Sequence, residues 1–291
     1  MPNSTNFNHI YANILQEVYY HGEEIINQRT GAKVRQIFGV NFKLNPSEDF
    51  PLITLRPIPI KAGWLSEIIW FLMGTDKMEF LDNNKNRFWN EFLDKAGNCP
   101  FNYGQIWQQN FGRNQMDSLI NSLQNEPSSR QNVITIWNGS QDGLDSPKQK
   151  NVPCITQFQV SISGGKLYLQ AYWRSEDLGL GFVNDLPAFA MLQLFLAQKL
   201  NLEVGELIWT IHNAHIYENQ FTIVEELIKR NLENSFEPIK LNLSELPNDC
   251  LDICYQQTDL ELCQTLLNQI FSTIKPKYQP LSRLAKMEIV K

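Results

Sequence analysis

Two side chains in this sequence have the reactivity needed for nucleophilic or acid–base catalysis. Cys154 follows Pro153 and a polar loop, and it begins a predicted strand. Its thiol could attack an electrophilic carbon in a cleft, although a lone cysteine is more often a small buried hydrophobic residue. Glu67 lies within the apolar stretch WLSEIIWFLM. Because a buried carboxylate is costly, Glu67 either pairs with an arginine or has a raised pKa that lets it exchange protons near neutrality.

Other polar side chains could bind an anionic or hydroxylated ligand. Arg174 ends a predicted strand beside the Ser175 hydroxyl, a pair that suits an anion. His215 and Tyr217 are two residues apart on a predicted strand, so they share a face and could both donate to a ligand hydroxyl. The alternative is an aromatic strand face without a ligand. Further candidate anion ligands are Arg29, Arg35 and Arg130.

Asp185 stands at the start of the apolar stretch DLPAFAMLQLFLAQKL, and two explanations fit it. Asp is a favoured N-cap, so its side chain could simply begin the helix that we expect at residues 185–200. Its carboxyl could instead read hydrogen-bonding groups on a ligand.

The elements that must position these residues follow from periodicity and turn signals. The segment CITQFQVSIS-GG-KLYLQAYWRS alternates on both sides of Gly164 and Gly165, which predicts a β-hairpin. Helices are expected at about 7–27, 61–74, 114–125, 185–200 and 218–231, and further strands at 34–44, 130–138 and 206–218. This order predicts an α+β fold with helices packed on a mixed or mostly antiparallel sheet. The polar loop at 138–153 does not resemble a linker, so we expect one catalytic domain over 1–291.

Composition limits the possible partners. The net charge is −6 and the sequence pI is about 5.3, with no block of Lys or Arg, so neither nucleic acid nor a membrane surface is an expected partner. The start of the chain has no signal-peptide pattern, and the longest apolar run is too short to span a bilayer. We therefore expect a cytoplasmic protein.

Five cysteines, an odd number, fit reduced thiols rather than a disulfide framework. Cys250 and Cys254, or His212 and His215, have only loose metal-ligand spacing, so no metal is expected.

Taken together, these residues resemble the thymidylate synthase family from about residue 25 to 220 and again at the C-terminus. The stretches that carry the resemblance include QRTGAKVRQIFGVNFKL, FWNEF, NYGQIW, SSRQNVITIWN, VPC, GGKLYLQAYWRSEDLGLG, LEVGELIWTIHNAHIYEN and the terminal KMEIVK. Their order and spacing agree throughout. The resemblance implies a sheet-mediated α+β homodimer that uses 5,10-methylene-tetrahydrofolate as co-substrate, with an arginine of each subunit reaching the partner's active site.

The resemblance also implies roles for individual residues. Cys154 matches the nucleophile that adds to C6 of a pyrimidine nucleotide, Glu67 the acid that manages protons at the base, and Tyr103 the active-site tyrosine near C5. The matching phosphate ligands are Arg29, Arg174, Ser175 and, across the dimer, Arg130. His215 and Tyr217 match the pair that holds the sugar 3′-hydroxyl. Trp89, Asp177 and Gly181 match folate-site positions, and MEIVK matches a tail that closes over the ligands. Nearby arginines are expected to lower the pKa of the Cys154 thiol.

Five positions depart from the family pattern. Asp185 replaces an Asn, Ile155 a His, Gln131 a second cross-dimer Arg, Asn213 an Asp, and Asn184 an aromatic residue near the folate. A carboxyl in place of the amide suits cytosine, because it can donate to N3 and accept from the 4-amino group. The family branch with Asp at this position hydroxymethylates deoxycytidylate, and related enzymes act on CMP.

The sequence therefore predicts 5-hydroxymethylation of dCMP or CMP with water as the final nucleophile. A thymidylate synthase that makes dTMP from dUMP is the main alternative. A uridylate hydroxymethylase and a catalytically silent nucleotide- or RNA-binding relative are the others. The sugar, the pathway and the choice between hydride and water as the last reactant stay open at this point.

Overall fold

The computed structural model describes residues 6–99, 102–144 and 152–290. Its centre is a six-stranded sheet in the order β1-β2-β6-β5-β4-β3. The strands are β1 (Glu23–Ile26), β2 (Lys33–Leu44), β3 (Val133–Thr135), β4 (Ile155–Ser163), β5 (Lys166–Asp177) and β6 (Glu203–Tyr217). β5 and β6 run parallel and every other neighbouring pair is antiparallel, so the sheet is mixed.

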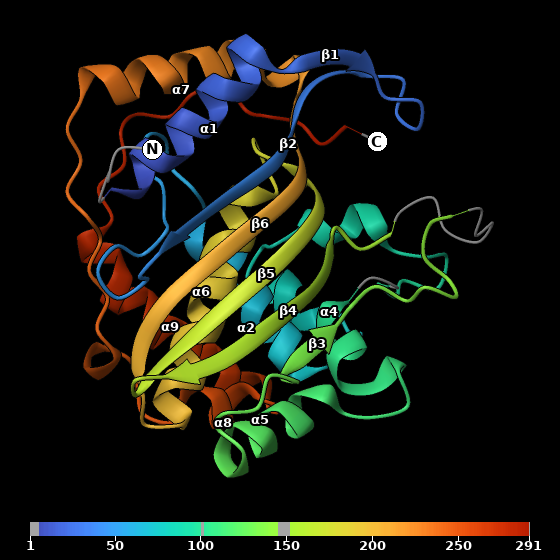
Figure 1. Ribbon diagram of the computed structural model, residues 1–291, viewed down its shortest axis with the longest axis vertical. Helices are drawn as coiled ribbons and strands as arrows, with labels where there is room; N and C mark the ends of the chain where they lie inside the picture. The colour runs from blue at the N-terminus through green and yellow to red at the C-terminus, as the bar shows by residue number, and fades with distance from the viewer. Residues whose placement is uncertain (1–5, 100–101, 145–151, 291) are drawn as a thin grey trace.

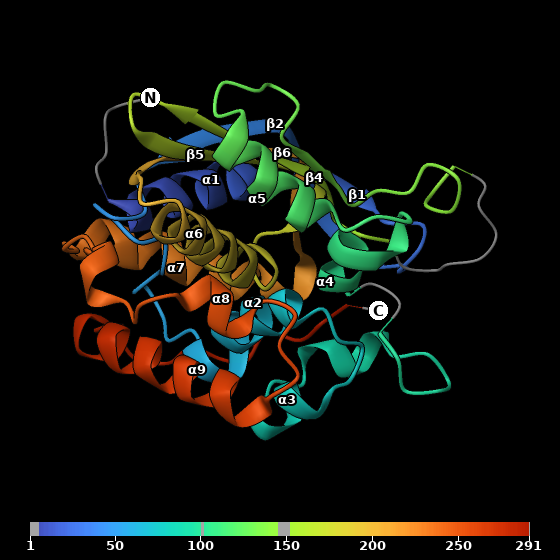
Figure 2. The same ribbon diagram turned by 90° about the horizontal axis from the view of Figure 1, so that it is seen from below.

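Helices cover one face of this sheet. They are α1 (Phe7–His21), α2 (Leu65–Met73), α3 (Glu79–Asn83), α4 (Tyr103–Gln105), α5 (Gln115–Asn125), α6 (Phe182–Lys199), α7 (Phe221–Glu233), α8 (Cys250–Cys254) and α9 (Leu260–Ile274). In Figure 1 the strands β4, β5 and β6 lie in front of α6 and α2, and Figure 2 shows α6, α2 and α9 stacked below the sheet. The predicted α+β class with helices packed on a mixed sheet is confirmed.

Local sequence signals explain the regular elements near the centre. Gly164 and Gly165 have positive φ values of 58° and 75°, which a two-residue hairpin turn requires, and they join β4 to β5 as predicted. Gly74, with φ 67°, ends α2 in the left-handed conformation. The nearly all-buried α6 is the crossover that brings β6 back parallel to β5.

Two predicted helix boundaries were wrong. The helix expected at 7–27 ends at His21, because after Gly22 the chain forms β1, where Ile25 and Ile26 pair with β2. The helix expected at 185–200 begins earlier, at Phe182, and Gly181 holds its N-cap position. Pro187 lies within its second turn.

Buried apolar side chains from Phe7 to Met287 form one cluster. The segment 232–280 adds α8 and α9 to it, and these helices contact α2 and, for α8, α6. None of the five cysteines forms a disulfide among the described residues, and of the five only Cys154 is partly exposed. No helix in the described part of the chain is long and apolar enough to cross a membrane. Part of the predicted loop at 138–153, and Lys291 of the predicted tail, lie outside the described residues.

Candidate active site

Cys154 lies directly before β4, where the end of β5 holds its backbone. The Arg174 N–H donates to the Cys154 carbonyl at 2.9 Å, and the Tyr103 hydroxyl is hydrogen-bonded to the Cys154 backbone. The Arg174 guanidinium donates to the carbonyls of Pro153 (2.8 Å) and Val152 (2.9 Å), so it fixes the residues that precede the thiol. The expectation that Cys154 opens a strand is consistent with its place directly before β4.

The expected low pKa of the thiol was wrong for the protein without ligands. Burial raises the pKa of Cys154 to about 11; Arg174 lowers it, but Asp185, Glu176 and Asp177 raise it further. Desolvation and the three acids therefore outweigh the single guanidinium that acts on the sulfur. The thiol is protonated at neutral pH, so its proton must leave as the sulfur attacks.

Glu67 projects from α2 into the interior with 4% of its surface exposed. Burial raises its pKa to about 8, and the Trp89 indole, which favours the ionised form, only partly opposes this. No ion pair links Glu67 to an arginine within the described ranges, so the structure agrees with the raised-pKa interpretation rather than the paired one. A carboxyl with this pKa can both give and take a proton near neutrality.

Asp185 is the fourth residue of α6, so the N-cap explanation was wrong. Burial first, and then the charges of Glu176, Glu67 and Asp177, hold its pKa well above the usual range. Gly181 leaves room for the carboxyl, because a Cβ there would lie 3.2 Å from Asp185 Oδ2 and 3.3 Å from the Asp177 carbonyl oxygen. The glycine thus lets Asp185 sit against the end of β5.

His215 and Tyr217 lie on one face of β6, as predicted, with ring centroids 5.2 Å apart at 88°. Asn213 Oδ1 is 3.0 Å from His215 Nδ1. Burial lowers the pKa of His215, with Arg174 and Arg29 acting in the same direction and Asp177 against it, so the ring is neutral at pH 7. A neutral ring that donates from Nδ1 to Asn213 keeps Nε2 as an acceptor.

The predicted phosphate ligands separate into two groups. Arg29 hydrogen-bonds the Tyr217 hydroxyl and acts on His215, while Ser175 pairs with Asn213 in the β5–β6 register. Arg174 also faces the Trp137 ring at 5.4 Å. Of these side chains, Arg174 acts on the Cys154 sulfur, and Arg29 acts on the His215–Tyr217 pair. Arg130, by contrast, is exposed before β3, and no described contact joins its side chain to the others.

Two of the predicted folate-site residues, Asp177 and Trp89, lie near Cys154 and Tyr103. Asp177 Oδ1 accepts from the N–H groups of Gly179 (2.8 Å) and Leu180 (3.3 Å), and both of its oxygens accept from Gln220 at 3.0 Å. Trp89, in the short 3-10 helix Phe88–Phe92, packs edge-on against Tyr103 with centroids 5.7 Å apart.

Asn184 Oδ1 is buried without a hydrogen-bond partner among the described residues, and it lies 3.0 Å from where a Cβ of Gly63 would be. A hydrogen-bond acceptor, Asn184 Oδ1, therefore remains unsatisfied next to the predicted folate positions. This is compatible with a polar ligand or a water there.

Glu176 is a site residue that the sequence analysis missed. It lies on β5 between two residues that were singled out, Ser175 and Asp177, yet only 1% of its surface is exposed. Burial holds its pKa well above the usual range, and it acts on both Cys154 and Asp185. The sequence did carry a signal for Glu176, because this carboxyl lies on a strand between residues predicted to bind ligands.

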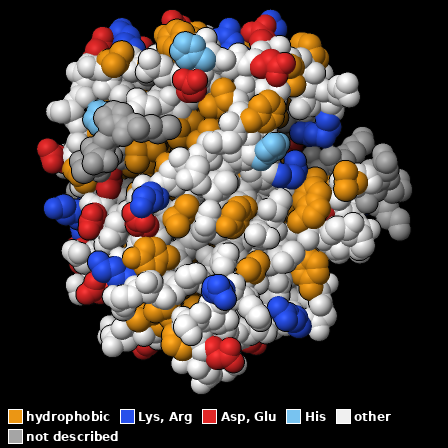
Figure 3. Space-filling model, viewed as in Figure 1, with side chains coloured by type: hydrophobic (Ala, Val, Ile, Leu, Met, Phe, Trp, Pro, Cys, Tyr) orange, Lys and Arg blue, Asp and Glu red, His pale blue; other side chains and the backbone are white. Residues whose placement is uncertain are grey.

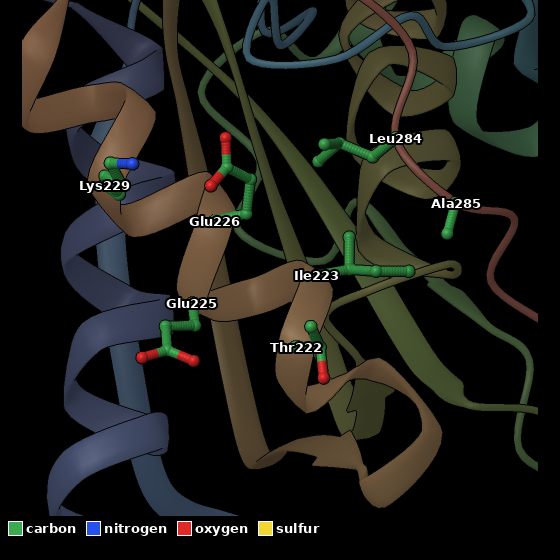
Figure 4. Close-up of a pocket in the computed structure, with 7 residues that line it drawn as sticks. All are labelled: Thr222, Ile223, Glu225, Glu226, Lys229, Leu284 and Ala285. Atoms are coloured by element: carbon green, nitrogen blue, oxygen red, sulfur yellow. The ribbon is translucent and has the colours of Figure 1, made fainter.

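The depression drawn in Figure 4 contains none of these residues. It lies between α7, which supplies Thr222, Ile223, Glu225, Glu226 and Lys229, and the tail residues Leu284 and Ala285. Within the described residues, no group of three or more His, Cys, Asp and Glu side chains is placed to hold a metal ion.

The fold and the site define an α+β enzyme in which a cysteine thiol lies near protonatable carboxyls and the guanidinium of Arg174. A family model described as thymidylate synthase matches residues 9–265. A curated thymidylate synthase of Corynebacterium aurimucosum is 35% identical over 240 residues, which cover 81% of this chain and 87% of that protein. The chain therefore belongs to the thymidylate synthase family, whose enzymes transfer a one-carbon unit from methylenetetrahydrofolate to a pyrimidine nucleotide.

Proposed function

We propose that this enzyme hydroxymethylates C5 of a cytidine monophosphate, either dCMP or CMP. The observation that carries the proposal is the partly exposed Asp185 carboxyl, whose pKa desolvation holds well above the usual range, so that it can carry a proton. Uracil already has a proton on N3, whereas cytosine does not. When a thiolate adds to C6, negative charge develops on the ring, and an acid beside N3 can neutralise it by supplying the proton that cytosine lacks. Only a cytosine substrate needs an ionisable group at this position.

The proposed reaction conserves every atom. Cys154 Sγ bonds to C6 as its proton leaves, and C5 becomes nucleophilic and forms a bond to the methylene carbon supplied by the folate. The C5 proton then departs as the bond between the transferred carbon and the folate nitrogen breaks, which leaves an exocyclic methylene and releases tetrahydrofolate. Water adds to that methylene while the Sγ–C6 bond breaks, giving the hydroxymethyl nucleotide. Glu67, with its pKa near 8, and the hydroxyl of Tyr103 are the proposed proton-handling groups at the base.

The binding roles follow from charge and position. Arg29, Arg174 and Ser175 are proposed to hold the phosphate, and the His215–Tyr217 pair the sugar 3′-hydroxyl. Trp89, Asp177 and Gly181 would hold the folate, which supplies the one-carbon unit when bound. The unsatisfied Asn184 Oδ1 could orient the attacking water. The tail is already anchored here, because Asn219 donates to the Glu288 carbonyl at 3.1 Å.

The assembly that we propose is a homodimer formed by the uncovered sheet face. That face has a shallow groove lined by Gln159, Ser161, Ser163, Tyr168, Gln170 and Ile208, and Figure 3 shows hydrophobic side chains distributed over it. Phe38 of β2 is 56% exposed. Large exposed apolar groups are typical of interfaces. The exposed Arg130 would then serve the partner's active site, and the single cluster of buried apolar residues supports one catalytic domain over 1–291. Cytoplasmic location stays a prediction.

One specific observation favours a second function. The curated relative at 35% identity is a thymidylate synthase, so conversion of dUMP to dTMP with dihydrofolate as co-product fits the family at least as well. The two functions differ in both substrate and final reactant.

An incubation of dCMP, CMP and dUMP with isotopically labelled methylene-tetrahydrofolate, followed by mass analysis, separates them. We expect label in a hydroxymethylated cytidine nucleotide. Label in dTMP, with dihydrofolate formed in equal amount, would exclude the proposed function.

A further inference from the structure

The indole ring of Trp137 lies against the guanidinium of Arg174. The Cζ atom of Arg174 is 5.4 Å from the centroid of the ring. Trp137 follows β3, and its N–H donates to the Thr156 carbonyl of β4 at 3.0 Å, which ties its backbone to the strand that begins directly after Cys154. An aromatic ring attracts a guanidinium and limits the orientations that it can adopt.

The turn after Trp137 fixes the place of this ring. A Cβ on Gly143 would lie 2.9 Å from Cζ2 and 3.0 Å from Cη2 of the indole, so glycine is what allows the turn to pack this closely. The φ of Gly143 is 62°, in the left-handed region that glycine adopts without strain. The N–H of Asn138 donates to Asp142 Oδ2 at 2.6 Å, and the N–H of Asp142 donates back to the Asn138 carbonyl at 2.8 Å, which closes the turn.

Core packing does not account for the position of Trp137. Its side chain is half-buried, and among the described residues it belongs neither to the cluster of buried apolar side chains nor to the partly buried ones that pack against that cluster. Its ring contacts Arg174 and Gly143 instead. The cation beside the ring is therefore the better physical reason for an aromatic residue here.

Arg174 is also held by the peptide groups that precede the thiol. Its Nε donates to the Pro153 carbonyl at 2.8 Å, and its Nη2 donates to the Val152 carbonyl at 2.9 Å. These two hydrogen bonds use one edge of the guanidinium. The Nη1 donors make no hydrogen bond within residues 6–99, 102–144 and 152–290, so they remain for an anion such as a phosphate.

We propose that Trp137 is a positioning residue, which holds the Arg174 guanidinium against the carbonyls of Val152 and Pro153 so that its Nη1 donors face the nucleotide phosphate. This inference rests on the proposed phosphate role of Arg174, but not on the identity of the base. It gives a function to the tryptophan of SSRQNVITIWN, a stretch in which only Arg130 had an expected role.

Calorimetric titration of the full-length enzyme with dCMP and dUMP, and with the nucleosides deoxycytidine and deoxyuridine, isolates the contribution of the phosphate. Trp137→Leu should weaken monophosphate binding by about three- to ten-fold, the range for a lost cation–π contact, and leave nucleoside binding unchanged. Trp137→Phe, which keeps an aromatic face, should restore most of the loss. Phe271→Leu on α9 is the matched control, because it removes a half-buried ring 5.6 Å from Lys61 Nζ, and it should change neither affinity.

A double-mutant cycle with Arg174→Ala tests whether Trp137 acts through Arg174. Arg174→Ala alone should weaken monophosphate binding more than Trp137→Leu does, and adding Trp137→Leu to it should cause no further loss. The same loss in both backgrounds, or an equal loss for nucleosides and monophosphates, would make Trp137 merely structural and overturn the inference.

Gly143→Ala provides a second variant if Trp137→Leu fails to fold, since its methyl group must displace the indole ring. It should give the same selective loss of monophosphate affinity, again absent in the Arg174→Ala background. Unchanged monophosphate binding in whichever of the two variants folds would overturn the inference.

Steady-state kinetics connects the contact to turnover. In Trp137→Leu the KM of the reacting nucleotide should rise by the same factor as its dissociation constant, and Trp137→Phe should bring it back toward the wild-type value. An unchanged KM would overturn the inference. If dUMP rather than dCMP reacts and the binding pattern holds, the Trp137–Arg174 pair stands and the proposed function fails.

Discussion

The carboxyl of Glu67 on α2 raises the pKa of the Asp185 carboxyl on α6. These two residues are 118 positions apart in the chain, and the contact between α2 and α6 beneath the sheet brings them together. Both carboxyls are kept from ionising mainly by burial. The site can therefore hold two acidic protons at neutral pH. The proton on Glu67 would serve proton transfer at the base, and the proton on Asp185 would go to ring N3.

Replacing Asp185 by Asn should change the base preference. An amide still forms two hydrogen bonds but cannot deliver a proton, so kcat/KM for dCMP should fall relative to that for dUMP by about 100-fold. Steady-state kinetics with both nucleotides would measure this ratio, and Asp49→Asn, at a buried carboxyl tied to Phe7 and Ile239, should not alter it. An unchanged ratio would mean that Asp185 does not read the base.

Replacing Cys154 by Ser should abolish turnover while preserving nucleotide binding. A serine hydroxyl is a far weaker nucleophile, so we expect kcat to fall by at least about 1,000-fold. Calorimetric titration should still detect the nucleotide, because the arginines remain. Cys263→Ser, at a buried cysteine of α9, is the control and should keep its activity. Turnover by Cys154→Ser would move the nucleophile elsewhere.

The hairpin and the end of α2 were predicted from the sequence because glycines at Gly164, Gly165 and Gly74 determine them locally. The strand at Glu23–Ile26 was missed because its partner, β2, is what makes it a strand. The start of α6 was missed because Asp185 is by type a favoured N-cap, whereas Gly181 holds that position in the structure.

The candidate site shows the same division between local and long-range information. Residue types and order identified Cys154, Glu67 and Asp185. Their pKa values could not be predicted, because each depends on burial and on charges that arrive from other elements. The arginine effect expected at Cys154 was outweighed first by burial and then by acids from β5 and α6. Glu176 was missed because exposure along β5 alternates irregularly near its end.

Glu67→Gln should reduce kcat by about 100-fold or more while leaving nucleotide affinity within a few-fold, since proton transfer is lost but volume is conserved. The variant also has a stability signature. The folded-state pKa of Glu67, about 8, lies above its unfolded value, so the native protein retains a proton that the unfolded chain has lost. Wild-type stability should therefore decline as pH rises from about 4.5 to 8.

Urea unfolding at several pH values would show this decline, and the Gln variant should lack Glu67's share of it. An identical pH dependence in both proteins would contradict a raised pKa for Glu67.

Mixing two inactive variants should restore activity if Arg130 serves the partner's site. Arg130→Ala and Cys154→Ser, unfolded and refolded together in equal amounts, would form heterodimers with one intact site each, about a quarter of the wild-type sites. Each variant refolded alone should stay nearly inactive, as would a mixture of Cys154→Ser with Glu67→Gln, which removes two residues of the same subunit's site. If no activity returns, Arg130 does not act across the dimer.

The source of the product oxygen tests the central claim most directly. The enzyme would be incubated with dCMP and methylene-tetrahydrofolate in ¹⁸O-labelled water, and the product nucleotide analysed by mass spectrometry while dihydrofolate is measured optically. We predict a 5-hydroxymethyl product that carries one labelled oxygen, with no dihydrofolate formed. A methylated product without label, accompanied by dihydrofolate, would contradict the proposed function.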